Sequence, residues 1–181
     1  MHARIQELID HLAAHRRDVY AAVAAVPESL RDRRPAPGHW SVAEVLEHLS
    51  MVESRVAAIL TARVAAARAS NVGPDEETSS VVASFQNVEH ALDRSNKVLS
   101  PEPVRPTGTL DAQASAHALA QSRAVMLTAL QTADGVALGG MMQTHPVLGQ
   151  LNMYHWIVAL GLHDARHAAQ IREVGESLAR A

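Results

Sequence analysis

The sequence predicts an all-α protein, built as an antiparallel four-helix bundle with a short extra helix or a long loop. Ala, Val and Leu dominate the composition, whereas aromatic residues make up only 3%. This composition favours helices over a sandwich or barrel, because strands are enriched in aromatic and β-branched residues. Apolar residues also recur at three- and four-residue intervals over long segments, and clusters of Pro and Gly separate these segments. An antiparallel bundle buries several such apolar stripes together.

The first helix is expected from about Ala3 to Val26. Its apolar stripe consists of Ile5, Leu8, Leu12, Val19, Val23 and Val26. The following segment, Arg31 to His39, contains two prolines and a glycine and is therefore expected to be a loop.

The second helix has clear signals at both ends. Ser41 is a favourable N-cap, and Glu44 three residues later completes a capping box. We expect this helix to run to about Arg68, before the helix-breaking run Ser70-Asn71-Val72-Gly73-Pro74.

The sequence of the second half of the chain predicts three further helices. The third helix is expected over roughly Ser79 to Leu99, followed by a proline-rich linker from Ser100 to Gly108. A fourth helix is expected from about Asp111 to Gln131. The glycine-rich segment Asp134 to Gln150 is predicted to be a long loop, which in a compact domain is often functional. The last helix is expected from about Leu151 to Leu178.

Length and composition restrict the class of protein. The 181 residues suffice for one domain, which we expect to span residues 1–181. The formal net charge of −3 provides no electrostatic footprint for nucleic acid. The chain has no cysteine, which excludes disulfides, thiolate metal ligands and cysteine nucleophiles within it. No run of about 18 apolar residues occurs, so we expect no membrane span and a soluble, cytoplasmic protein.

Three histidines on apolar helix faces are the main functional signal. His163 and His167 are four residues apart, which places both rings on one face of the last helix. His48 lies on the apolar stripe of the second helix, together with Val45 and Val52. Imidazoles that face a core need polar partners, because unpaired polar groups are costly there. A shared metal ion would satisfy all three rings at once.

Neutral imidazole is the commonest protein ligand for zinc and also suits nickel, copper and iron. Three protein ligands would leave coordination positions open for water or substrate, which is typical of catalytic sites. The alternative is that these are ordinary core histidines. The chain contains 11 histidines, and a His-x-x-x-His spacing often arises by chance.

Other polar residues near the histidines receive weaker assignments. Gln170, three residues after His167, could contact the metal ligands from outside the coordination sphere. Asp164 is expected at the surface or in a salt bridge between helices. His145 and His155 are not assigned as ligands.

Two sequence blocks resemble the DinB/YfiT superfamily of small four-helix-bundle proteins. The first is Pro37-Gly38-His39-Trp40-Ser41-Val42-Ala43-Glu44-Val45-Leu46-Glu47-His48-Leu49, a Trp-Ser segment followed by a helix that carries a histidine. The second runs from His145-Pro146-Val147-Leu148-Gly149-Gln150-Leu151 through Trp156 to His163-Asp164-Ala165-Arg166-His167-Ala168-Ala169-Gln170-Ile171. The resemblance covers most of the chain and implies that His48, His163 and His167 bind a divalent metal, nickel or zinc.

The resemblance also implies an activity. Characterised members are metal-dependent transferases that use bacillithiol or mycothiol, so we expect a thiol S-transferase acting on small electrophiles, and a homodimer. The segment from about Gly73 to Gly140 carries no motif that identifies the substrate. Two alternatives stay open: a metal-dependent hydrolase, and a non-catalytic, stress-related binding protein that a metal stabilises.

Overall fold

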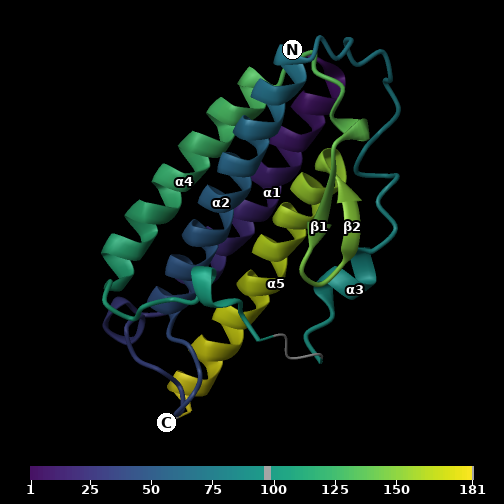
Figure 1. The fold of residues 1–181 in the computed structure, drawn as a ribbon. Coiled ribbons are helices and arrows are strands. Elements are labelled where there is room, and N and C mark those ends of the chain that lie inside the picture. The colour runs from purple at the N-terminus through teal and green to yellow at the C-terminus, as the bar shows by residue number, and fades with distance from the viewer. Residues whose placement is uncertain (96–98, 181) are drawn as a thin grey trace.

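The computed structural model describes residues 1–95 and 99–180, and four long helices lie side by side in it (Figure 1). These helices are α1 (Ala3–Ala24), α2 (Val42–Ala69), α4 (Ala112–Thr132) and α5 (Met153–Ala179). The described residues also form a short helix α3 (Val88–Leu92) and a hairpin of strands β1 (Met142–His145) and β2 (Gly149–Asn152). Three 3₁₀ turns complete the structure, at Glu28–Leu30, Glu102–Val104 and Leu138–Gly140. The protein is therefore mostly helical, as its composition predicts.

Side-chain caps fix where three of the long helices begin. Ser41, Asp111 and Asn152 each accept a hydrogen bond from a backbone N–H three residues further along the chain. Such caps satisfy donors that have no partner within the helix. The bounds of all four long helices agree with the sequence-based expectation to within about two residues, the usual uncertainty of helix ends.

The third helix is much shorter than expected. Instead of a helix over residues 79–99, only α3 is helical, and residues 96–98 lie outside the described part of the chain. Hydroxyl side chains bind the local backbone here: Ser80 accepts from the N–H of Ala83, and Ser84 donates to the carbonyl of Val81. Such bonds compete with helical ones, which explains why an apolar period alone overestimated the helix.

The segment from Asp134 to Gln150 is not the long loop that its glycines predict. It contains a 3₁₀ turn and strand β1, which pairs with β2 in antiparallel register from Met142 opposite Asn152 to His145 opposite Gly149. Gly149 has φ +72, a conformation that few other residues adopt readily and that the hairpin turn requires. Each strand has only four residues, too few for a visible alternation of apolar residues.

The long helices pack as two parallel pairs, α1 with α5 and α2 with α4. Residues later in α1 contact residues later in α5, as expected for parallel helices: His11 contacts Val158, and Asp18 contacts Arg172. Contacts between α2 and α4 advance in the same way (Figure 1). The expected antiparallel arrangement therefore relates one pair to the other and does not hold within a pair. Parallel neighbours need a connection that returns along the helix, and the described residues between α2 and α4, 70–95 and 99–111, belong to it.

A layer of buried charge crosses the core at mid-height of the helices. Glu53 of α2 accepts hydrogen bonds from Arg16 of α1 at 3.1 Å, and from Ser122 and Arg123 of α4, both at 2.6 Å. Asp164 of α5 binds the same two arginines, at 2.9 and 3.1 Å. Glu53 and Asp164 are 0% and 1% exposed. All four long helices therefore meet in one network of two cations and two anions.

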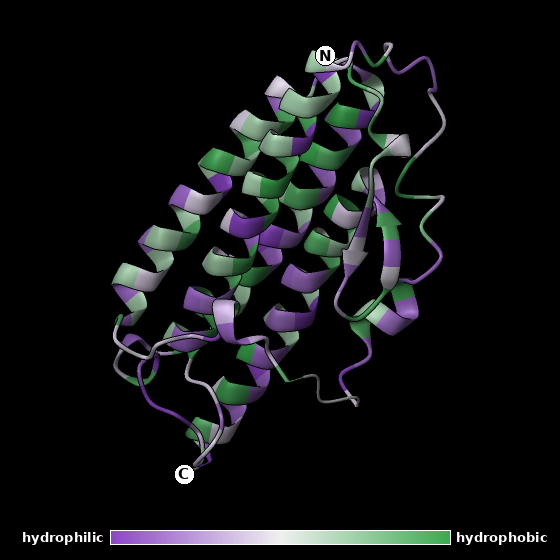
Figure 2. Ribbon diagram, viewed as in Figure 1, coloured by the Kyte–Doolittle hydropathy of each residue, from purple (hydrophilic) through white to green (hydrophobic). Residues whose placement is uncertain are grey.

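This layer divides the hydrophobic core into two clusters. One contains Leu12, Val56, Met126 and Leu162, and the other Val19, Leu49, Leu119 and Ala168. Hydrophobic residues occur along all four long helices (Figure 2). Even so, none of the helices within residues 1–95 and 99–180 combines the length and the apolar composition that crossing a bilayer requires.

The charged layer predicts that two single substitutions differ greatly in their effect on the free energy of unfolding. Glu53→Gln leaves the buried Arg16 and the partly buried Arg123 short of a counter-charge and should lower the free energy of unfolding by about 3–5 kcal/mol. Asp18→Asn removes an ion pair with Arg172 that is nearly half exposed and should cost less than about 1 kcal/mol. Urea unfolding of both variants measures the difference. Equal stability of the two variants would contradict a structural role for the layer.

Candidate metal centre

His48 is positioned by the capping box that starts α2. Ser41 accepts a hydrogen bond from the N–H of Glu44 at 3.2 Å, and its own N–H donates to the Glu44 carboxylate at 2.9 Å. Arg34 forms a salt bridge with the same carboxylate. The first turn of α2 is therefore held in place, and His48 follows about two turns after the cap, with only 5% of its surface exposed.

The other two histidines lie one turn apart on α5. The ring centroids of His163 and His167 are 4.4 Å apart. The Nε2 atom of His163 lies 3.1 Å from Nε2 of His167 and 3.2 Å from Nε2 of His48. One nitrogen from each of the three rings falls within 4.8 Å of the others, a group that could hold a metal ion. The structure thus brings together the three histidines that the sequence singles out.

Hydrogen bonds on the far side of two rings determine their tautomers. Nδ1 of His48 lies 2.6 Å from the carbonyl oxygen of Val104, and Nδ1 of His167 lies 2.7 Å from the amide oxygen of Gln170. Oxygens of these types only accept hydrogen bonds, so both Nδ1 atoms carry the proton and donate. The Nε2 atoms of His48 and His167 then each carry a lone pair, and both lone pairs face Nε2 of His163.

Burial keeps the three rings neutral. Burial lowers the pKa of His48, and it lowers the pKa of His167 from 6.5 to about 3. The pKa of His163 is well below 6.5, first because of burial and further because His167 and His48 lie beside it. Neutral imidazole is the form that binds metals, so protons compete weakly for this site near neutral pH.

The three histidines differ in how deeply they are buried. The Trp40 ring lies 5.0 Å from the His48 ring and 6.4 Å from the His167 ring, centroid to centroid, and is nearly parallel to the latter. His48 and His167 are buried, whereas His163 is only half-buried. Nδ1 of His163 is itself buried and has no hydrogen-bond partner among the described residues.

Sequence reasoning missed one contributor to this region and left the role of another open. The carbonyl of Val104 comes from the linker before α4, and no side-chain motif could identify a backbone acceptor. Asp164 belongs to the buried charged layer and not to the surface, although a salt bridge between helices was one of its two expected roles. An acidic side chain within an otherwise apolar helix face was the sequence signal that could have indicated a buried Asp164.

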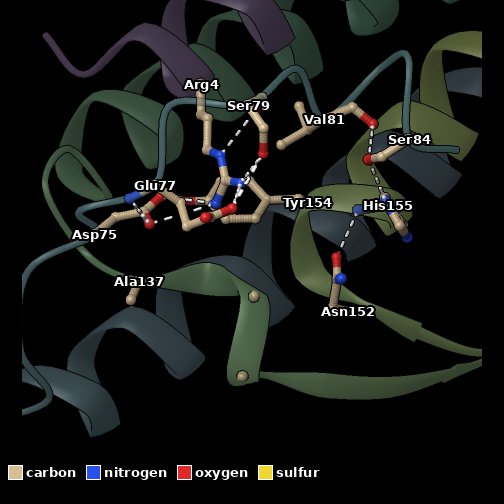
Figure 3. A pocket seen from close by; sticks show the side chains of 12 residues that line it. Arg4, Asp75, Glu77, Ser79, Val81, Ser84, Ala137, Asn152, Tyr154 and His155 are labelled. Carbon is tan, nitrogen blue, oxygen red and sulfur yellow. Dashed lines mark hydrogen bonds and ion pairs between the residues drawn. The ribbon is translucent and has the colours of Figure 1, made fainter.

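Two surface cavities of the described part of the chain are not lined by these histidines. One, of about 420 Å³, lies at the N-terminal ends of α1 and α5 (Figure 3). Arg4 binds Asp75 there at 3.4 Å, Tyr154 donates to the same carboxylate, and His155 lies 3.0 Å from the hydroxyl of Ser84. These polar groups satisfy one another, so their contacts hold the segment after α2 against the helix ends. His155 is therefore separate from the three clustered histidines.

The sequence of this chain is similar to those of known proteins. The sequence profile of the DinB superfamily matches residues 11–171. The chain is 26% identical over 151 residues to "Uncharacterized protein YuaE" of Bacillus subtilis (strain 168), an alignment that covers 83% of this chain and 86% of the relative. No solved structure matches the chain.

The pKa of His167 predicts a pH dependence of stability. Because the folded pKa is about 3 and the unfolded value 6.5, only the unfolded chain binds this proton between those limits, and stability falls as the pH is lowered. In the presence of a chelator, proton binding to His167 in the unfolded chain should lower the free energy of unfolding by about 2 kcal/mol when the pH falls from about 7.5 to about 5.

Urea unfolding at both pH values measures this cost. His167→Gln should lose that part of the pH dependence, whereas His117→Gln, an exposed change on α4, should keep it. The same pH dependence in all three proteins would show that His167 is not held neutral by burial.

Proposed function

The chain belongs to the DinB superfamily, and from that premise we propose that it is a divalent-metal-dependent thiol S-transferase. In this proposal His48, His163 and His167 bind the ion through their Nε2 atoms. A low-molecular-weight thiol and a small electrophile are the substrates, and zinc or nickel is the ion, because imidazole nitrogen suits both.

The tautomers of the histidines are the observation that carries the metal assignment. Lone pairs of His48 and His167 face the same point, and even a proton on Nε2 of His163 can serve only one of them. A cation at that point satisfies all three nitrogens. Donation of the remaining ring N–H to a carbonyl, as His48 does to Val104, is typical of histidines that bind metals.

When held by His48, His163 and His167, a divalent ion would lower the pKa of a thiol beside it and so supply a thiolate nucleophile near neutral pH. With an epoxide as electrophile, the S–C bond forms while the C–O bond breaks, and the thiol proton ends on the released oxygen. The protein's own residues orient and shield the reactants. Trp40 covers His48 and His167 on one side and excludes water there, and Val104 and Gln170 hold the rings in place.

Hydrolysis is less well supported, because the carboxylates beside His48 that could assist as a general base are engaged elsewhere. The carboxylates closest to His48 along α2 are already engaged. Glu44 pairs with Arg34, and Glu47 accepts hydrogen bonds from the backbone N–H groups of Thr107 and Gly108 at 3.0 and 3.1 Å. Neither carboxylate is available to activate water without breaking these bonds.

The proposal includes the fold of the superfamily, a four-helix bundle made of α1, α2, α4 and α5. The support is the packing of α1 on α5 and of α2 on α4, with the buried charged layer between the pairs. Facing helices of a bundle are where such proteins build their metal sites.

The metal assignment predicts about one zinc or nickel ion per chain after incubation with the metal and removal of the excess. Mass spectrometry of untagged protein measures the stoichiometry. His48→Ala and His163→Ala should lose the ion, because each removes one of three ligands. His117→Ala is the matched control: His117 is exposed on α4 and binds Gln121, so its loss should leave the ion in place. Wild-type protein without metal would disprove the assignment.

The transferase assignment predicts turnover that needs both metal and thiol. Metal-loaded protein should consume epoxides or chloro-nitroaromatics with a low-molecular-weight thiol, and His48→Ala should reduce the rate by at least about 100-fold, the effect expected for loss of the activating ion. Absorbance of the product and loss of free thiol measure the rate. Metal that raises the melting temperature without any turnover would instead support a binding protein.

A further inference from the structure

The hydrogen bonds that the described residues make to the three clustered histidines all involve neutral groups. Nδ1 of His48 donates to the carbonyl of Val104 at 2.6 Å and lies 3.5 Å from the hydroxyl of Ser100. Nδ1 of His167 donates to the amide oxygen of Gln170 at 2.7 Å. The remaining contacts of this kind join the histidines to one another. In many metal sites a carboxylate accepts from the ligating histidine instead, so the neutrality of these acceptors is a distinctive feature.

The acidic residues that neighbour the ligands in sequence bind other groups. Asp164 follows His163 but belongs to the buried charged layer, where it binds the two arginines. Glu47 precedes His48 but accepts hydrogen bonds from backbone N–H groups of the linker before α4. Within the described part of the chain, the group of side chains that could hold an ion contains no carboxylate. An ion bound there would therefore keep its double positive charge, since its protein ligands and the acceptors behind them are neutral.

Gln170 is the acceptor whose chemistry depends on a side chain, because Val104 contributes its backbone carbonyl. Three residues separate Gln170 from His167, a spacing that places neighbours on one face of a helix. A glutamate of nearly the same shape would accept the same hydrogen bond, but it would bring a negative charge to within one imidazole ring of the ion. The amide therefore fixes the orientation of the His167 ring without adding charge.

We propose that Gln170 is a positioning residue that keeps the metal centre free of negative charge from the protein and thereby favours an anionic ligand, such as a thiolate, in the open coordination position. This inference rests on the proposed function, because the open position requires an ion held by three protein ligands. Gln170 acts through His167 in two ways. Its hydrogen bond strengthens metal binding by orienting the ring, and its neutrality leaves the charge of the ion to attract the incoming ligand.

The test loads the protein with cobalt(II) and uses azide as the anionic probe. Competition with a chelator measures the affinity for cobalt, and visible absorption follows the azide titration. Gln170→Glu should bind cobalt about ten-fold more tightly or better, because a carboxylate accepts a stronger hydrogen bond and attracts the ion. The same charge repels the anion, so azide should bind about five-fold more weakly or worse.

Gln170→Met separates orientation from charge, because it has a similar length but no oxygen. It should bind cobalt about 10- to 100-fold more weakly than the wild type, the usual effect of removing the partner of a ligating histidine. Its affinity for azide once loaded should be unchanged, because no charge is added. Opposite shifts of the cobalt and azide affinities in Gln170→Glu are an effect that a merely structural role would not produce.

Gln121→Glu is the matched control, since Gln121 also contacts a histidine, His117, but is exposed on α4 and lies outside the cluster. It should leave both affinities at the wild-type values. Cobalt and azide affinities of Gln170→Glu that equal those of the wild type, or that both shift in the same direction, would overturn the role of Gln170 alone. Failure of the wild type to bind cobalt would overturn the proposed function as well.

Discussion

Three buried charges and the partly buried Arg123 set the positions of the four long helices relative to one another. Apolar contacts are not directional, so they bring amphipathic helices together without fixing their relative height. The bonds of Arg16, Glu53, Arg123 and Asp164 are directional, and each long helix contributes one of these residues. Breaking one of these bonds leaves a charge without its partner in a core that is apolar above and below it. A shift of one helix along another is therefore opposed at this layer.

The same layer accounts for the place of the histidine cluster. Asp164 immediately follows His163 on α5, and Glu53 follows His48 by five residues on α2. When these carboxylates meet the shared arginines, the histidines of the two helices are brought to the same level. Helix α5 thus carries two kinds of polar group on different faces: a charged face that fixes register, and a neutral face of imidazoles.

The parallel pairing of helices has a consequence for the site. Because α2 and α4 run in the same direction, the chain must return along the molecule between them, and the end of this connection passes His48. There Val104 supplies the carbonyl that holds the His48 tautomer. The connection between α4 and α5 likewise forms the hairpin whose tip carries His145. The first of these two segments therefore contributes directly to the surroundings of the histidines.

The sequence by itself determined the parts of this protein that depend on local interactions. The capping box at Ser41 and the 3.6-residue apolar period located the long helices, and the four-residue spacing placed His163 and His167 on one face. Tertiary structure decided the rest. The parallel pairs and the burial of Asp164 depend on contacts between residues far apart in the chain. Local periodicity contains no information about such contacts, because it describes which face of a segment is apolar and not which segment covers that face.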